Sequence, residues 1–416
     1  MSESSAVTGA RGAVAEDPLD VPLERLRRRT SEKWRHYGGD VLPVFVAEMD
    51  VDTPPPVAAA LRRALADGDT GYQAGARYQR AFADFAAARW GWQIDVRRTV
   101  TTAGVMHGAL ALVGLLTAPG GAVVVNTPVY PPFLDYPRAA GREVLTAPLT
   151  AAGRLDLAAT ERAFAAAAAR GPAVYLLCSP HNPTGTVHTR EELTAVTALA
   201  RRHGVAVVSD EIHAPLSHVP FTPLLTVTDD AYSLVSASKA WNLAGLPASI
   251  VVAGAAAPRR LGELPSFERG TGSHLGVIAH SAALEEGTAW LDALLVSLAE
   301  RRRLLGELLA EHLPGVRWQP PEATYLAWLD CRELLAREPG SIEVGGPGPG
   351  GGETPVGDPA AGGSVTEPSR MFLERGRVAL SPGSAFGAPG FARLNFATSP
   401  AVLTQAVRRM ADGVRA

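Results

Sequence analysis

The sequence predicts an α/β protein in which helices cover both faces of a large, mostly parallel sheet, with a smaller α+β domain beside it. Between about residues 99 and 255, short apolar runs alternate with longer helical patterns, which is typical of βαβ units. After residue 290 the order changes to one long helical pattern followed by strand-like runs. With 416 residues, 46% hydrophobic and 19% charged, the chain can form one large or two medium domains with full cores.

The elements of the larger unit follow from these patterns. An apolar run at 41–49 has the length of a strand, and Thr53 before three prolines is typical of a capped helix start. Helices are expected at 57–66, 78–90, 105–116, 157–169 and 190–203. Strands are expected near 123–126, 173–178, 205–209, 233–236 and 249–253.

The smaller unit is predicted to combine both chain ends. A long helix is expected at 290–313, strands at 324–329, 377–380 and 393–396, and a last helix at 400–411. The domain division expected is a disordered tail at 1–17, an N-terminal segment of the small domain at 18–60, the large domain at 61–289 and the rest of the small domain at 290–416. Glycine and proline crowd 338–369, which predicts a flexible surface loop inside this last part.

Composition excludes several classes of protein. A net charge of −3 gives no reason to expect a nucleic-acid partner. The two cysteines, Cys178 and Cys331, lie in apolar runs, and the histidines lack ligand spacing, so no metal site is predicted. Residues 1–16 are small and polar, without the apolar stretch of a signal peptide, and no membrane span is expected, so a cytoplasmic location follows by default.

Lys239 is the residue that first suggests chemistry. It follows a short apolar strand pattern and two hydroxyl residues, Ser236 and Ser238. A buried lysine loses hydration, its pKa falls toward neutrality, and the free amine can act as a nucleophile and base, as Schiff-base lysines do. A solvated lysine at a strand end is the alternative.

Other polar residues fall where a parallel sheet binds ligands, at the carboxyl ends of its strands. Asp210 closes one predicted strand and Asn182 follows another; each suits a ligand site and equally an ordinary turn. An acid there could hold a proton on a pyridine nitrogen. Tyr130 lies in a proline-rich loop and could stack on a flat ligand or belong to the core. Arg393, in an apolar strand, could grip a carboxylate or form an internal ion pair.

The start of the predicted helix at 105–116 is a further candidate. Its free backbone amides at Val105 and Met106 could bind a phosphate, although the nearby glycines could equally serve close packing.

Seven stretches occur in a characteristic order: AEMD at 47–50, TGY at 70–72, CSPHNPTG at 178–185, SDEIH at 209–213, SASK at 236–239, TYLAWLD at 324–330 and RLN at 393–395. In order and spacing, these stretches resemble pyridoxal-phosphate-dependent enzymes of the aminotransferase fold (fold type I), and within that fold the MalY/PatB-like cystathionine β-lyase, or cysteine C–S lyase, branch. The resemblance covers about residues 30–410 and implies a large domain with a seven-stranded type of sheet.

The resemblance implies roles around the cofactor ring. Lys239 would hold pyridoxal 5′-phosphate as a Schiff base and shuttle the substrate proton. Asp210 would pair with the pyridine nitrogen, Asn182 and His213 would contact the ring's 3-oxygen, and Tyr130 would stack on the ring.

It also implies roles at the phosphate and the substrate. The phosphate would be held by the backbone at Val105 and Met106, by Ser236 and Ser238, and by Tyr72 from a second subunit, so a homodimer with shared active sites is implied. Arg393 would bind the substrate α-carboxylate with help from the backbone at Ala47.

The same resemblance bears on the reaction. Many aminotransferases of the fold carry arginine eight residues after the lysine, where this chain has Pro247, and tyrosine where it has His213. Both differences match the lyase branch and favour β-elimination of an S-substituted L-cysteine, such as cystathionine, to a thiol, pyruvate and ammonia. An aminotransferase and a regulatory binding protein with residual lyase activity are the alternatives. Tyr72, Trp241 and residues 271–275 are candidates for contact with the leaving group.

Overall fold

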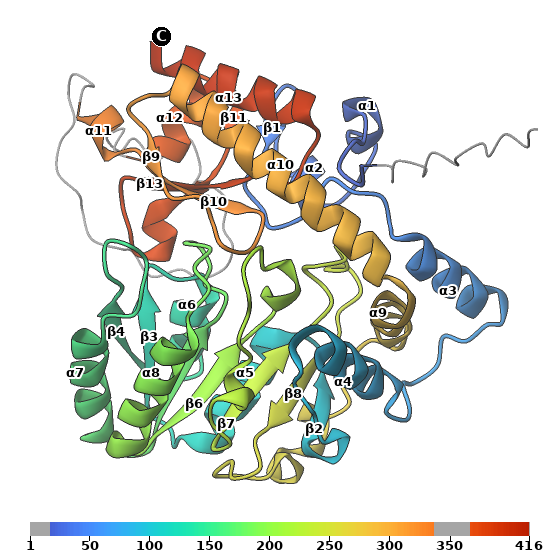
Figure 1. Cartoon of the computed structure of the whole chain (residues 1–416), viewed down its shortest axis with the longest axis vertical. Helices are drawn as coiled ribbons and strands as arrows, with labels where there is room; N and C mark the ends of the chain where they lie inside the picture. The colour runs from blue at the N-terminus through green and yellow to red at the C-terminus, as the bar shows by residue number, and fades with distance from the viewer. Residues whose placement is uncertain (1–16, 337–366, 416) are drawn as a thin grey trace, which may run out of the picture.

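A seven-stranded sheet forms the centre of the large domain in the computed structural model, which describes residues 17–336 and 367–415 (Figure 1). The strand order is β2-β8-β7-β6-β5-β3-β4, and only β8 runs antiparallel to its neighbours. The predicted α/β class with a mostly parallel sheet is confirmed. The strands are β2 (Thr99–Thr102), β3 (Ala122–Thr127), β4 (Glu143–Pro148), β5 (Ala173–Cys178), β6 (Val205–Asp210), β7 (Ala231–Val235) and β8 (Ser249–Ala253).

Helices cover both faces of this sheet because its central strands are apolar on both sides. Helices α5 and α6 share one core with alternate residues of β3 and β5, such as Val123 and Val174. Helices α7 and α8 pack on the opposite face with the intervening residues, such as Val124 and Tyr175. The helices of the large domain are α4 (Arg77–Trp90), α5 (Val105–Leu116), α6 (Pro132–Ala139), α7 (Leu157–Ala168), α8 (Arg190–His203) and α9 (His274–Glu286).

The small domain lies above the carboxyl ends of the parallel strands (Figure 1). Its antiparallel sheet has the order β12-β13-β10-β9, and a separate parallel pair joins β1 from the N-terminal region to β11. Its strands are β1 (Leu42–Pro43), β9 (Arg317–Trp318), β10 (Leu326–Asp330), β11 (Val378–Ala379), β12 (Ser381–Pro382) and β13 (Phe391–Asn395). The remaining helices are α1 (Leu23–Leu26), α2 (Glu32–Arg35), α3 (Pro55–Ala66), α10 (Thr288–His312), α11 (Arg332–Leu335), α12 (Pro368–Glu374) and α13 (Pro400–Arg415).

Several predicted elements differ from the structure. The run at 41–49 pairs as a strand only at Leu42–Pro43, and its later carbonyls at Val46 and Glu48 accept from the Asn395 side chain instead. Thr53 does not cap α3, whose N-cap is Pro54. The strand expected at 377–380 is only Val378–Ala379 long and pairs with β1. Elements that were not predicted include β4, α6, α9, β9, β12, α11 and α12.

The two segments predicted to be flexible fall largely outside the described residues. This applies to 1–16 and to 338–366. Residues 367–369, which the loop prediction included, differ: Pro368 opens α12 and Ser369 is buried against the small domain. Within residues 17–336 and 367–415, no helix is both long and apolar enough to cross a membrane.

Candidate active site

The topology brings polar side chains together at one edge of the large sheet. Strand β6 ends at Asp210 and β5 ends at Cys178, four residues before Asn182. Strand β7 ends at Val235, four residues before Lys239. Because these three strands are parallel neighbours, the segments that follow them leave the sheet at the same edge, beneath the small domain.

A cavity of about 330 Å³ opens at this edge. Its volume is within the range of small-molecule sites. Predicted site residues in its wall are Ala47, Val105, Met106, Tyr130, Asn182, Asp210, His213 and Lys239. The sequence reasoning missed other parts of the wall, which are Ala103, Gly104, His107, Tyr136, Cys178 and Ile212. The structure therefore gathers most of the predicted residues around one space.

Lys239 is half-buried, not fully buried as a lysine in an apolar strand would be. Its Nζ donates a hydrogen bond to the carbonyl oxygen of Ala47 at 3.2 Å. The hydroxyl of Tyr325 donates to the same oxygen at 2.9 Å. Tyr325 belongs to the stretch TYLAWLD, but the sequence predicted no role for it at the site. Its contact with Ala47 joins the small domain to the segment that faces the lysine.

Two buried titratable groups face Lys239. Burial raises the pKa of Asp210 to about 7, although the backbone N–H of Ile212 and the charge of Lys239 favour its ionised form. Burial, together with the nearby cations Lys239 and Arg393, lowers the pKa of His213 to about 3. His213 is therefore neutral at pH 7. Among the described residues its Nδ1 has no hydrogen-bond partner, although it is buried.

Asn182 and Arg393 form the side of the site nearest the small domain. Arg393 is 1% exposed and lies behind Asn182, to whose Oδ1 its Nη1 donates at 3.1 Å. Its Nη2 donates to the carbonyl oxygen of Phe45 at 3.1 Å and to Ser381 Oγ at 3.2 Å. The guanidinium also lies 4.8 Å above the ring of Phe386. All these acceptors are neutral, so a ligand carboxylate would be a stronger partner.

The N-terminus of α5 lies at the wall of the same cavity. In a helix the first backbone N–H groups have no partner within the helix, so those of Val105 and Met106 are available to an anion. The predicted hydroxyl ligands are placed differently. Ser236 Oγ donates to Ala248 O at 2.7 Å and accepts from the N–H of Ser238 at 3.1 Å, so it is engaged within its own loop. Neither Ser236 nor Ser238 is part of the cavity wall.

Two residues and one segment suggested by the sequence lie outside the cavity wall. Tyr72 is fully exposed and is not part of the wall. Trp241 is buried in the core, where its Nε1 donates to Gly287 O, and it is not part of the cavity wall. In segment 271–275, Thr271 Oγ1 accepts from the N–H of Ala103 and so supports the wall. No group of three or more His, Cys, Asp or Glu side chains in the described parts of the chain could hold a metal ion.

The sequence of this chain is similar to known proteins along nearly its whole length. The family model for aminotransferase class I and II matches residues 40–410. The chain belongs to this family.

Relatives within the aminotransferase class I and II family are similar along nearly the whole chain. A Mycobacterium tuberculosis (strain CDC 1551 / Oshkosh) protein named "Putative cystathionine beta-lyase" is 50% identical, over 95% of this chain and 97% of its own. A cystathionine beta-lyase of Corynebacterium glutamicum is 33% identical, over 94% and 98%. A crystal structure from Corynebacterium diphtheriae, described as a "putative plp-dependent beta-cystathionase", has a TM-score of 0.82 at 33% identity and covers 95% of this chain and 98% of that one.

Proposed function

We propose that this protein is a pyridoxal-phosphate-dependent carbon–sulfur lyase that performs β-elimination on S-substituted L-cysteines, of which cystathionine is one. The observation that carries the proposal is the placement of a half-buried amine, Lys239, in one cavity with a buried carboxyl group, Asp210. The names of the similar proteins support this reaction class over transamination.

The residues fit the cofactor on grounds that belong to this structure. The cavity offers a lysine amine for attachment, an acid for the ring nitrogen and a helix N-terminus for the phosphate. The buried Nδ1 of His213 points to a polar partner that the described chain does not supply. When bound, pyridoxal phosphate supplies an electron sink for the electrons left at the substrate Cα after its proton departs.

The chain's own residues then have separate tasks. Lys239 Nζ would carry the cofactor and, once freed by the substrate amine, would take the Cα proton. Asp210 would be held ionised by a cationic ring nitrogen, since an opposite charge lowers the pKa that burial has raised. The carbonyl of Ala47, fixed by Tyr325, would orient the Lys239 amine.

Arg393 would bind the substrate α-carboxylate by turning its donors from neutral oxygens to a charged partner. Asn182 would contact both this arginine and the cofactor, because it lines the cavity and accepts from Arg393 Nη1. The leaving thiolate departs from Cβ, and the remaining fragment hydrolyses to pyruvate and ammonia.

We also propose that the active form is a homodimer with shared sites. Tyr72 is fully exposed in the single chain, which is unusual for a large aromatic side chain. A second copy that covers this surface would bring Tyr72 to the phosphate end of the partner's cavity.

The decisive experiment uses Lys239→Ala and Lys239→Arg with a cysteine thioether and no keto-acid acceptor. The wild-type enzyme should release thiol and pyruvate, and both variants should lose at least about 10³-fold in rate together with the absorbance band of the lysine-bound cofactor. Release of thiol by either variant at the wild-type rate would refute the role of Lys239. Absence of thiol from the wild-type enzyme until a keto acid is added would instead identify an aminotransferase.

A further inference from the structure

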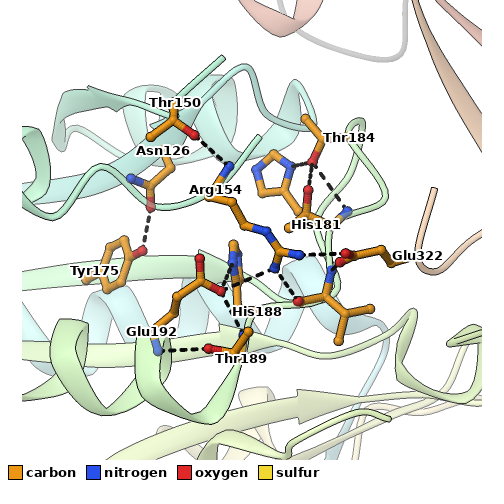
Figure 2. Close-up of polar contacts among 12 residues, drawn as sticks. Asn126, Thr150, Arg154, Tyr175, His181, Thr184, His188, Thr189, Glu192 and Glu322 are labelled. Carbon is orange, nitrogen blue, oxygen red and sulfur yellow. Dashed lines mark hydrogen bonds and ion pairs between the residues drawn. The ribbon is translucent and has the colours of Figure 1, made fainter. Parts of the chain in front are cut away.

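We propose that Arg154 and Glu322 are positioning residues that hold the loop carrying Asn182 against the small domain and so keep Arg393 oriented for the substrate carboxylate. The proposal rests on the role proposed for Arg393 above. Neither residue lines the cavity, and both lie on the polar network between the two domains (Figure 2).

The ion pair crosses the boundary between the domains. Arg154 precedes α7 of the large domain, and Glu322 precedes β10 of the small domain. Arg154 Nη2 lies 2.5 Å from Glu322 Oε1, and Arg154 Nη1 lies 3.3 Å from Glu192 Oε2 (Figure 2). The side chains of Arg154 and Glu322 are 31% and 34% exposed, so solvent screens them only in part.

The pair grips both backbone groups of one loop residue. Val187 donates its N–H to Glu322 Oε2 at 2.8 Å, and its carbonyl oxygen accepts from Arg154 Nη1 at 2.7 Å. The next small-domain residue, Ala323, donates its N–H to Gly185 O at 2.9 Å. Loop 185–187 of the large domain is therefore attached to the small domain along its length.

The same loop determines where Asn182 lies. Within it, His181 N–H donates to Thr186 O at 2.8 Å, and Gly185 N–H donates to His181 O at 2.8 Å. The carbonyl of Asn182 accepts from the N–H of Tyr130, another residue of the cavity wall. A shift at Val187 would pass through Thr186 and His181 to Asn182.

The Arg154–Glu322 pair, together with its two hydrogen bonds to Val187, is called the clamp below. It matters most when substrate binds. Arg393 attaches the loop to the small domain from inside through Asn182 Oδ1, but a substrate carboxylate competes for the same guanidinium donors. While that exchange takes place, Glu322 and Arg154 provide an attachment that does not depend on Arg393. Without them, Asn182 and Arg393 would sample more arrangements, and carboxylate binding would weaken.

The test measures binding by Glu322→Gln and Arg154→Gln holoenzymes through the initial change in cofactor absorbance after rapid mixing, before thiol is released, over a range of ligand concentrations. For S-methyl-L-cysteine, each variant should show about fivefold weaker binding, the size expected for a partly exposed ion pair. For 2-(methylthio)ethylamine, which lacks the carboxylate, binding should stay within twofold of wild type. The double variant should bind no more weakly than either single variant, because the two residues act as one unit.

A matched control removes an ion pair inside the large domain. Arg170 and Glu143 lie 2.6 Å apart with side chains 41% and 48% exposed, so Glu143→Gln should leave both titrations unchanged. The proposal would be overturned if S-methyl-L-cysteine and 2-(methylthio)ethylamine were weakened equally, or if the binding of S-methyl-L-cysteine were not weakened. Thermal melting shows whether each variant is folded. If the wild-type enzyme binds the amino acid without releasing thiol, the lyase assignment fails while the clamp is still tested. If it does not respond to the amino acid at all, both fail.

Discussion

Two consecutive acids at the end of β6, Asp210 and Glu211, have different surroundings. Asp210 lines the cavity, while Glu211 is 2% exposed inside the protein and its Oε1 accepts from the N–H of Leu224 at 2.8 Å. Burial and, to a smaller extent, the charge of Asp210 raise the pKa of Glu211 to about 8, although the hydroxyls of Ser209 and Ser233 favour the ionised form. Glu211 is therefore mostly protonated at pH 7.

Glu211→Gln should make folding less sensitive to pH. A carboxyl group whose folded pKa is above its ordinary value binds more protons in the native state, so wild-type stability falls as pH rises from the unfolded value of about 4.3 through about 8. Glutamine has no such proton to lose. The melting temperature of the variant minus that of wild type, measured on the apoenzyme from pH 5 to 9, should rise with pH. A difference that stays flat across this range would mean that Glu211 is already ionised in the native state.

At the level of single residues, the sequence could indicate a site residue only where a polar or charged side chain came at or just after the end of a predicted strand. Asp210 and Lys239 met that condition, and both line the cavity. Tyr325 did not, because its contact with Ala47 joins positions 278 residues apart. Ser236 has the right chemistry, but its hydroxyl bonds to Ala248 in a turn that the local pattern does not encode.

The loop between β5 and α8 depends on one glycine. Gly185 has φ +70°, and a Cβ there would lie 2.2 Å from Pro321 Cβ and 3.0 Å from Ala323 O of the small domain. Gly204, the C-cap of α8, has φ +65°, but a Cβ there would meet nothing within 4 Å. The two glycines share a backbone conformation and differ in packing.

Alanine substitutions at these two positions should separate conformational strain from steric conflict. Gly204→Ala should lower the free energy of unfolding by about 1 kcal/mol, the cost of placing an ordinary residue in the left-handed region. Gly185→Ala should cost at least about 2 kcal/mol more, because the backbone of 321–323 must also move. Urea unfolding of both variants measures the difference. Similar midpoints for the two would show that the domain contact at Gly185 yields easily.

At the level of elements, the spacing of apolar residues in the sequence predicted those helices and strands whose apolar side chains pack into the core. The central strands β5 and β6 and helices α5 and α8 lie close to their expected bounds because their apolar residues face the core. The edge strand β4 was missed, since half of its residues are exposed and its pattern is weak. At 41–49 an apolar run was read as a strand, but those residues are buried without a long partner strand.

At the scale of the whole molecule, the alternation of strands and helices predicted the large sheet. The surroundings of the cavity also depend on contacts between residues far apart in the sequence, which no local pattern predicts. The small domain supports the cavity wall through Arg393, which donates to Asn182, and through Tyr325, which donates to Ala47. A second chain is proposed to reach the cavity through Tyr72. In the described chain Tyr72 is fully exposed and outside the cavity wall. A phenol with a role at a phosphate would act from such a place only across an interface.

Mixed dimers distinguish action across the interface from action within one chain. Tyr72→Phe alone should weaken cofactor binding about tenfold, the loss of one hydrogen bond to a charged group. In a dimer of one Lys239→Ala chain and one Tyr72→Phe chain, the only site with a lysine would receive an intact Tyr72 from its partner. That site should therefore bind the cofactor with wild-type affinity, and the mixed dimer should have about half of the wild-type activity. Tyr72 acting within its own chain would instead leave this site as weak as in the Tyr72→Phe homodimer, and a protein that sediments as a monomer at assay concentration would exclude sharing altogether.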